Sequence, residues 1–330
     1  MRKKNRLNLA DYKKGILAGD RVILSRAITL VESSLSSDNL MSTQLINDLY
    51  EHTGKSLRIG ITGVPGVGKS TFIEYFGQFL VAAGKKIAVL TVDPSSQKSG
   101  GSILGDKTRM DNLSQHKMAY IRPSATGDAL GGIAHKTRES MLLCEAAGFE
   151  IVIIETVGVG QSETAVKEMV DYFLLLMLAG AGDELQGIKK GIMEMADDII
   201  ITKADKQNLN QAKRAKKEYE NALHLFPANE NGWQPSVTLS SAIEQWGAND
   251  IWSLMTKYHA KILENGYFNY NRSQQNVNWM HQTILYYLKS NFYKASVIKD
   301  ILPTFEQEVS SGNEHAVKAA LELLSKYNKS

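Results

Sequence analysis

The feature that most constrains this chain is a glycine-rich turn that ends in a lysine and a serine, Gly63-Val-Pro-Gly-Val-Gly-Lys-Ser70. It fits the pattern G-x-x-x-x-G-K-[S/T], follows directly on the apolar run 57–62 and precedes a helical pattern. The pattern requires that context, because the glycines let backbone N–H groups close around phosphate oxygens and the helix N-terminus adds a favourable dipole. The sequence therefore predicts a phosphate-binding loop between a strand and a helix.

The last residues of this loop are the groups that phosphoryl-transfer sites use. Lys69 can bridge the β- and γ-phosphates of a nucleotide, and the Ser70 hydroxyl can hold Mg²⁺. A glycine-rich turn without a ligand is the alternative, but the flanking patterns favour a nucleotide site. The residues predicted to contact nucleotide here are Gly63, Val64, Pro65, Gly66, Val67, Gly68, Lys69, Ser70 and Thr71.

Strand-like and helix-like segments alternate from residue 57 to about residue 265. The strand-like runs are short and nearly continuously apolar, which suits strands buried on both faces. Their alternation with amphipathic segments predicts a parallel sheet with helices on both sides. We therefore expect the α/β class, as a P-loop NTPase with a mostly parallel sheet flanked by helices. The predicted strands are 57–62, 87–92, 151–154, 172–178 and 199–202.

Helical patterns flank this region on both sides. Asp20 can cap a helix whose apolar residues share one face, the Ser-rich patch 33–37 breaks the pattern, and a short helix is expected over 42–52. Pro303 is expected to kink or divide a C-terminal helix. The C-terminal helices are expected over 274–292, 295–309 and 313–327. The predicted division is 1–55, an N-terminal helical extension; 56–268, the P-loop domain; and 269–330, a helical arm that packs on the core or on a second subunit.

Composition narrows the function classes. A formal net charge of +3 over 330 residues is too small to indicate nucleic acid, and the basic run 213–217 is expected to be a solvated helix face. The lone cysteine, Cys144, excludes an internal disulfide and fits a reducing compartment, so a cytoplasmic protein with a buried thiol is expected. The most apolar segment, 172–181, is too short to cross a bilayer. We expect no nucleic-acid partner and no membrane partner.

Acidic residues follow the predicted strands, at the edge where ligands of open α/β sheets bind. Asp93 and Glu155 each follow a strand directly, and Asp106 lies in the loop beyond Asp93. An acid after a strand is commonly a cap or turn residue, but beside a phosphate loop we favour magnesium ligation, because Mg²⁺ prefers carboxylates, hydroxyls, waters and phosphate oxygens. The predicted metal set is Ser70, Asp93, Asp106 and Glu155.

The segment Thr202-Lys-Ala-Asp205 resembles the N-K-x-D motif that selects guanine. The Asp205 carboxylate can accept from both N1–H and N2–H₂ of guanine; adenine offers no such pair of donors and would leave a buried acid unpaired. The Lys203 stem can cover the face of the base. Thr202 stands where Asn is usual. Its reach is shorter and it has one donor, so its bond to the base N7 or to the phosphate loop is expected to be lost or bridged by water.

Farther along the chain, Leu239-Ser-Ser-Ala-Ile243 follows another strand pattern. It resembles the S-A loop, whose backbone N–H groups meet the guanine O6. A Ser-rich turn without a ligand is common, so this segment gains weight only from its place after Thr202–Asp205. The predicted base site is Thr202, Lys203, Asp205, Ser241, Ala242 and Ile243.

The order of these motifs resembles that of the MeaB/ArgK-type GTPases, relatives of the methylmalonic aciduria type A protein. Thr202 departs from the usual Asn of this family, and Ala179 stands where Pro is expected. The resemblance covers most of residues 15–245. Besides the phosphate loop it is carried by Leu17-Ala-Gly-Asp-Arg21, Ala27-Ile-Thr-Leu-Val-Glu32, Val92-Asp-Pro-Ser-Ser96, Gly100-Gly-Ser-Ile-Leu-Gly-Asp-Lys-Thr-Arg-Met110, Glu155-Thr-Val-Gly-Val-Gly-Gln-Ser-Glu163 and Gly180-Ala-Gly-Asp-Glu-Leu-Gln-Gly-Ile-Lys-Lys-Gly191.

The resemblance implies a GTP-hydrolysing chaperone that binds methylmalonyl-CoA mutase or a related adenosylcobalamin-dependent acyl-CoA mutase, and that gates cofactor loading and protection. It implies a homodimer joined largely through the C-terminal helices, Mg²⁺, and GTP and GDP as substrate and product. It also implies a loop that responds to nucleotide and partner, in which Lys189 is tied to partner-stimulated hydrolysis. The residues of this switch loop are Gly182, Asp183, Glu184, Gln186, Lys189 and Lys190.

For hydrolysis the candidates are groups that position and stabilise charge, since this chemistry needs little else from the protein. The Glu155-Thr-Val-Gly158 turn resembles the D/E-x-x-G turn whose Gly N–H can sense the γ-phosphate. We assign no catalytic base, and Arg109 and Arg138 are further candidates for charge stabilisation. Turnover is expected to be slow without a partner. The predicted catalytic residues are Lys69, Asp106, Glu155 and Lys189.

Three other functions are weighed against this one. An ATPase or kinase serving amino-acid transport (lysine, arginine, ornithine) would use ATP, which Asp205 disfavours. A metal-insertion GTPase would usually carry Cys/His clusters, whereas His116 and His135 are isolated in the sequence. A module that only holds nucleotide would not need Lys69, Ser70 and the acids.

Overall fold

The computed structural model describes residues 6–33, 35–92, 110–123, 130–156, 162–180, 190–227 and 229–329. The chain folds into two compact units, Met1–Gln275 and Asn276–Ser330. The predicted boundaries at residues 55 and 268 remain predictions. Of the predicted site residues, Asp93, Asp106 and the loop 182–189 lie outside the described ranges.

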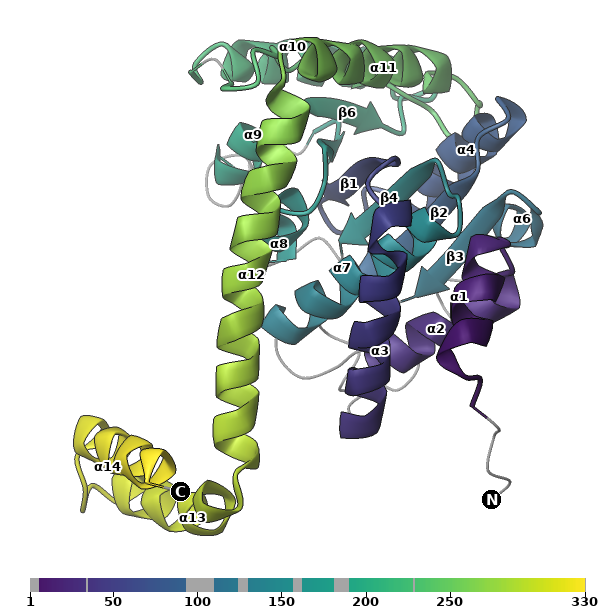
Figure 1. Ribbon diagram of the computed structural model, residues 1–330. Helices are drawn as coiled ribbons and strands as arrows, with labels where there is room; N and C mark the ends of the chain where they lie inside the picture. Colours follow the sequence, from purple (N-terminus) through teal and green to yellow (C-terminus); the bar gives the residue numbers. More distant parts are fainter. Residues whose placement is uncertain are drawn as a thin grey trace. The chain divides into compact units, whose positions relative to one another are not determined.

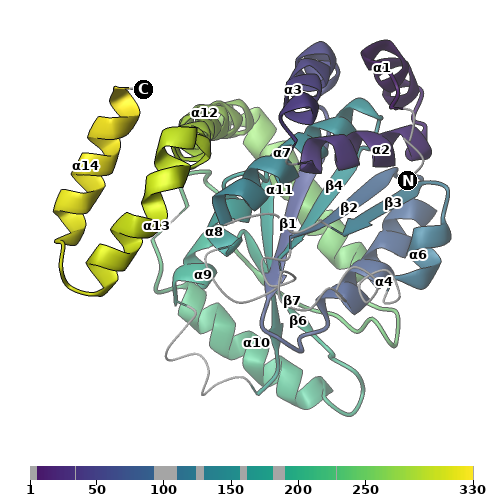
Figure 2. The same ribbon diagram turned by 90° about the horizontal axis from the view of Figure 1, so that it is seen from below.

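The first unit is built on a seven-stranded sheet in the order β3-β2-β4-β1-β5-β6-β7. Every neighbouring pair is parallel, so all strands end at the same edge, as Figure 2 shows from below. This confirms the predicted α/β fold class. The sequence did not predict β3, a short edge strand that ends in Pro123. The strands are β1 Leu57–Gly63, β2 Ile87–Val92, β3 Ala119–Pro123, β4 Ile151–Thr156, β5 Tyr172–Leu178, β6 Asp198–Thr202 and β7 Val237–Leu239.

Helices cover both faces of the sheet (Figures 1 and 2). On one face lie α4 and α11; on the other, α7 and α8 contact the strands, and α2 and α3 pack outside α7. The described helices of this unit are α1 Leu9–Leu17, α2 Arg21–Glu32, α3 Ser36–Leu49, η1 Tyr50–His52, α4 Lys69–Ala82, α6 Asp111–Gln115, α7 Leu130–Ala146, α8 Ser162–Lys167, α9 Lys190–Met195, α10 Leu209–Leu223 and α11 Ala248–Glu264. The long α12, Tyr267–Lys294, begins in this unit.

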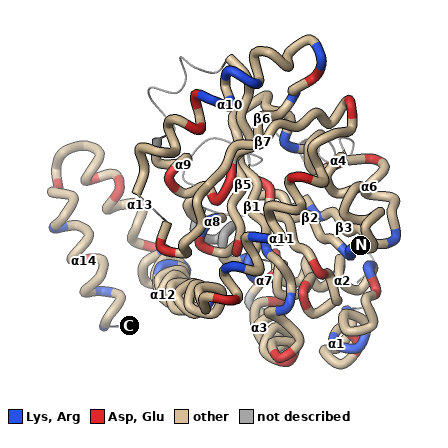
Figure 3. The backbone as a smooth tube through the Cα atoms, turned by 90° about the horizontal axis from the view of Figure 1, so that it is seen from above, with Lys and Arg blue, Asp and Glu red and all other residues tan. Residues whose placement is uncertain are grey.

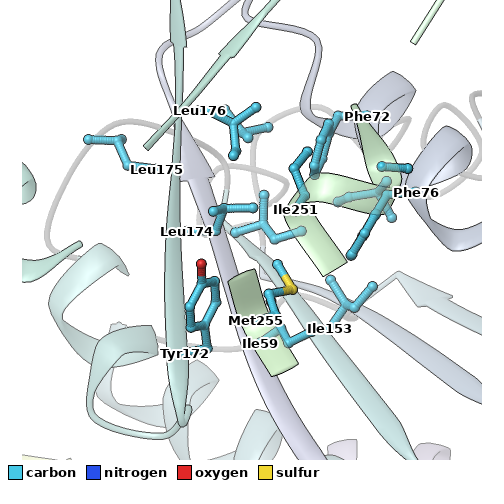
Figure 4. Packing of buried hydrophobic residues seen from close by; sticks show 14 of the residues in the cluster. Ile59, Phe72, Phe76, Ile153, Tyr172, Leu174, Leu175, Leu176, Ile251 and Met255 are labelled. Carbon is cyan, nitrogen blue, oxygen red and sulfur yellow. The ribbon is translucent and has the colours of Figure 1, made fainter. Parts of the chain in front are cut away.

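The main core lies between the sheet and helices α4 and α11. Figure 4 shows Phe72 and Phe76 of α4, Ile251 and Met255 of α11 and Ile59 of the sheet within one cluster. All of β1, β2 and β4 is buried, which explains why near-continuous apolar runs predicted these strands correctly. The phosphate loop is thus anchored between a fully buried strand and a helix with a buried aromatic face.

A buried network of charged side chains lies where the strands begin, at the opposite end of the strands from the phosphate loop. The Arg58 Nε donates to Glu145 Oε1 at 2.8 Å, and the Arg272 Nη2 donates to Asp171 Oδ2 at 2.7 Å. Arg272, on the first turns of α12, also donates to the Gly54 and Ser56 carbonyls and lies over the Phe268 ring. This network fixes the start of α12 to the first unit.

The second unit is a small helical assembly made of the rest of α12, α13 Ser296–Ser310 and α14 Ala316–Asn328 (Figure 1). Its buried apolar residues, within the part that the structure describes, are Ile298, Ala319 and Leu323. Pro303 lies inside α13 without ending it, so of the expected kink or division the division does not occur. Among the described residues, no helix combines the length and apolarity needed to cross a bilayer.

Two further sequence expectations can be compared with the fold. The helix expected over 42–52 begins earlier, at Ser36, inside the Ser-rich patch that was expected to break the pattern. The basic run 213–217 lies on α10, where Lys213, Arg214 and Lys217 are exposed and Lys216 pairs with Glu220. Figure 3 shows acidic and basic residues interspersed along the chain. Cys144 is fully buried, and burial raises the pKa of its thiol, as expected for a core cysteine.

Candidate nucleotide site

The turn after β1 has the backbone geometry of a loop that can enclose an anion. Gly66 and Gly68 adopt φ values of 77° and 89°, a left-handed region that side-chain-bearing residues rarely occupy. Gly68 is the N-cap of α4, so the helix N-terminus directly follows the loop. The Lys69 ammonium donates to the Gly63 carbonyl at 2.9 Å, which folds the lysine back over the loop. Left-handed glycines, a helix N-terminus and a lysine at one turn are the features that a phosphate-binding loop combines.

The electrostatic setting of Lys69 is mixed. Burial lowers the pKa of the Lys69 ammonium, and the carboxylates of Glu155 and Glu163 oppose that shift. Glu163 lies in the first turn of α8 and is 2% exposed. From the sequence, Glu163 is only part of the stretch Glu155–Glu163 that carries the family resemblance, and no role is predicted for it. Its position after the Glu155 turn, in the first turn of a helix, was the available signal.

The end of β4 brings a carboxylate to the phosphate loop. Glu155, 7% exposed, lies beside Ile61 of β1 and Thr91 of β2 in the sheet register. The Ser70 hydroxyl donates to Glu155 Oε1 at 3.1 Å. A hydroxyl and a carboxylate oxygen at this distance are hard oxygen donors of the kind that Mg²⁺ prefers, so these residues fit that ion.

The loop after β6 is bonded directly to the phosphate loop. Thr202, at the end of β6, is 6% exposed, and its Oγ1 donates to the Val67 carbonyl at 2.8 Å. The Lys203 ammonium donates to the Gly66 carbonyl at 2.8 Å, while the Lys203 backbone has φ 55°. From the sequence, the Thr202 bond to the loop or to the base is expected to be lost or bridged by water. The structure shows a direct bond to the loop.

The carboxylate proposed for base recognition is held by the loop after β7. The Ser241 hydroxyl donates to Asp205 Oδ1, and the Glu244 N–H donates to Ser241 Oγ at 3.0 Å. Ser241 is fully buried, whereas Ile243 is 77% exposed. Because the Ala204 N–H also donates to the Ser240 carbonyl, the two loops form one unit beside the phosphate loop. The structure therefore brings together the predicted residues of the loops after β1, β4, β6 and β7.

Other predicted residues do not join this cluster or cannot be placed. Asp93, Asp106, Arg109 and Lys189 lie outside the described residues, and of Lys190 only the backbone, at the start of α9, is described. Arg138 is buried on α7, where its guanidinium donates to the Gln275 and Glu168 carbonyls. These bonds tie α12 to the end of α8, so Arg138 acts in the scaffold, and the structure does not support it as a charge stabiliser in this chain.

Comparison with known proteins agrees with this geometry. The family model described as "Methylmalonyl Co-A mutase-associated GTPase MeaB" matches residues 24–296. A "Putative GTPase" of Caulobacter vibrioides is 48% identical over 97% of this chain and 98% of its own length. The mouse "Methylmalonic aciduria type A homolog, mitochondrial" is 43% identical over 90% of this chain and 74% of its own length.

A solved structure gives the same result for the fold. The crystal structure of "LAO/AO transport system kinase" matches with a TM-score of 0.75 and 35% sequence identity, covering 99% of this chain and 100% of that one.

Proposed function

Because the chain belongs to the family of methylmalonyl-CoA mutase-associated GTPases and is itself a GTPase, we propose that it is a chaperone of an adenosylcobalamin-dependent acyl-CoA mutase. In this role it gates adenosylcobalamin loading and protects the mutase, methylmalonyl-CoA mutase or a relative, through GTP hydrolysis. The observation that carries the nucleotide half of the proposal is a pair of direct hydrogen bonds. Through Thr202 and Lys203, the loop after β6, here called the base loop, binds the phosphate loop. The family description carries the mutase half.

The described residues suit distinct tasks in GTP hydrolysis. Lys69 and the loop N–H groups bind the phosphates, Asp205 accepts the guanine donors, and Ser241 orients Asp205. Ser70 and Glu155 would hold Mg²⁺, which neutralises phosphate charge when bound. Asp93 and Asp106 remain proposed metal ligands, and the loop 182–190 a proposed switch in which Lys189 responds to the partner. We expect slow turnover alone and stimulation by the client, in a cytoplasmic setting consistent with the buried lone thiol.

The second unit supports a homodimer as part of this proposal. On α12, four apolar side chains recur at helical spacing, and Val277, Met280, Ile284 and Leu288 are 47%, 52%, 48% and 57% exposed. The unit buries little apolar surface of its own, so a second copy of the chain is the natural cover for this stripe. In analytical ultracentrifugation, Ile284→Asp with Leu288→Asp should yield monomers, whereas Lys289→Asp, a control on another side of α12, should stay dimeric. A wild type that sediments as a monomer would contradict the dimer.

The experiment that tests the mutase half measures GTP turnover with and without methylmalonyl-CoA mutase from the same source. The proposal predicts that the mutase raises the rate, and that adenosylcobalamin transfer to the mutase stops when a non-hydrolysable GTP analogue replaces GTP. Lys217→Ala, on the exposed face of α10, is the control for a surface substitution, and the mutase should raise its rate as it raises that of the wild type. No binding and no change in rate would contradict the client assignment.

A kinase or ATPase linked to amino-acid transport is the second candidate, because the matching solved structure carries a transport-kinase name. It predicts ATP consumption and a phosphorylated protein product. Incubation with γ-labelled ATP and with γ-labelled GTP separates the two candidates. Label released as inorganic phosphate from GTP alone supports the chaperone, and label transferred from ATP to protein supports the kinase.

A further inference from the structure

The side chain at the end of β6 has one hydrogen to donate, and the structure shows where that hydrogen goes. The Thr202 Oγ1 lies 2.8 Å from the Val67 carbonyl oxygen and 3.3 Å from the Met177 carbonyl oxygen. Both acceptors belong to the backbone, and Thr202 is 6% exposed. A hydroxyl carries a single O–H, so the shorter contact, to Val67, takes it.

The next residue, Lys203, also donates to a backbone carbonyl of the phosphate loop. The Lys203 ammonium donates to the Gly66 carbonyl at 2.8 Å, one residue before Val67. Two consecutive residues of the base loop therefore direct their side-chain donors to two consecutive carbonyls of the phosphate loop. These carbonyls belong to the loop whose N–H groups would bind phosphate, so the two bonds hold the backbone of that loop in place.

Guanine would meet this loop with both donors and acceptors. Its N1–H and N2–H₂ suit the Asp205 carboxylate, whereas N7 and O6 are acceptors that need a donor. An Asn side chain offers two N–H groups and can serve a loop carbonyl and N7 together; a Thr hydroxyl that serves the carbonyl has no hydrogen left for N7.

We propose that Thr202 is a positioning residue for the phosphate loop, and that this chain recognises guanine without a hydrogen bond from Thr202 to N7. The inference rests on the proposed guanine-nucleotide site and deepens it. Selectivity for guanine then comes from its N1–H and N2–H₂ groups, which donate to Asp205. Guanine nucleotides that lack N7 should bind with the same affinity as those that have it.

The test compares GDP with 7-deaza-GDP, in which a C–H replaces N7, by calorimetry with Mg²⁺ on the full-length protein. For the wild type we expect the two dissociation constants to agree within about twofold, and for Thr202→Asn we expect GDP to bind roughly threefold to tenfold tighter than 7-deaza-GDP, the value of one added neutral hydrogen bond. Using the ratio within each protein cancels effects of the substitution on folding or on the loop.

Two further variants test the positioning role. Thr202→Val should weaken both nucleotides by the same factor, because it removes the bond to Val67, and Thr202→Ser should restore both. A wild type that binds GDP tenfold tighter than 7-deaza-GDP would overturn the inference alone. A wild type that binds ADP but not GDP would overturn the proposed guanine site and this inference with it.

Discussion

Charged residues lie at both edges of the central sheet, the one where the strands begin and the one where they end. The two groups differ in the partners that pair with their charges. At the edge where strands begin, Arg58, Glu145, Asp171 and Arg272 pair with one another and with backbone groups, and Glu145 and Asp171 side chains are 0% and 1% exposed. At the edge where strands end, Lys69, Ser70 and Asp205 are partly exposed, and their hydrogen bonds join the loops after β1, β4 and β7. Buried charged side chains that pair with one another indicate a structural role. Charged side chains on partly exposed loops indicate a ligand site.

The largest effect should come from breaking the scaffold edge. Arg272→Met removes four hydrogen bonds and leaves the Asp171 carboxylate buried without its cation. We expect the free energy of unfolding in urea to fall by about 3–5 kcal/mol.

The matched control is Lys318→Met, which removes an exposed pair with Glu314 and should leave the free energy of unfolding nearly unchanged. The distinction between the edges fails if Arg272→Met leaves stability unchanged but abolishes nucleotide binding.

The next effect belongs to the ligand edge. Lys69→Ala removes the cation that lies over the phosphate loop, and we expect kcat for GTP hydrolysis to fall roughly 10²–10³-fold with little change in stability. Lys85→Ala is the control, because Lys85 pairs with Glu150 at the other edge. Equal losses of rate in both variants would contradict the assignment of Lys69.

A smaller effect sharpens the base site. Ser241→Ala removes the hydroxyl that orients Asp205, so the preference for GDP over inosine diphosphate, which lacks N2–H₂, should fall by about 0.5–1.5 kcal/mol. The neighbouring Ser240→Ala is the control, since its hydroxyl donates to the Trp246 carbonyl. If both variants keep the wild-type preference, Ser241 does not act through Asp205.

The smallest effect is a pH dependence at the scaffold edge. Burial raises the pKa of Asp198, at the start of β6, to about 6, although Tyr172 and Ser236 donate to it. The folded protein then binds a proton that the unfolded chain releases near its ordinary pKa of 3.8, so this group's contribution to stability falls as pH rises from about 4 to about 6 and is level above.

Thermal unfolding at pH 5 and pH 8 checks this. The stability of Asp198→Asn, measured relative to the wild type, should be higher at pH 8 than at pH 5. A relative gain at pH 5 would show that the sign is wrong.

The same comparison explains what the sequence could predict. The strands β1, β2 and β4 and the phosphate loop follow from local patterns, because burial on both faces and the need for left-handed glycines leave few alternatives. The strand β3 was missed because it has only five residues, and Arg122 and Pro123 interrupt its apolar run, although Ala119, Tyr120 and Ile121 are buried.

Contacts between loops could not be predicted from local patterns. The Thr202 bond to Val67 joins residues 135 positions apart and depends on the spacing of β1 and β6 across β5. Arg138 shows the reverse case, in which a plausible catalytic residue type proves to be part of the scaffold once its carbonyl partners are known.

The central claim is that the strand-end loops form a guanine-nucleotide site, and calorimetry of GDP against ADP with Mg²⁺ tests it most directly. On the wild type we predict a strong preference for GDP, and on Asp205→Ala a loss of that preference while binding through the phosphate loop persists. Equal or tighter binding of ADP by the wild type would contradict the claim and would favour the ATP-dependent alternative.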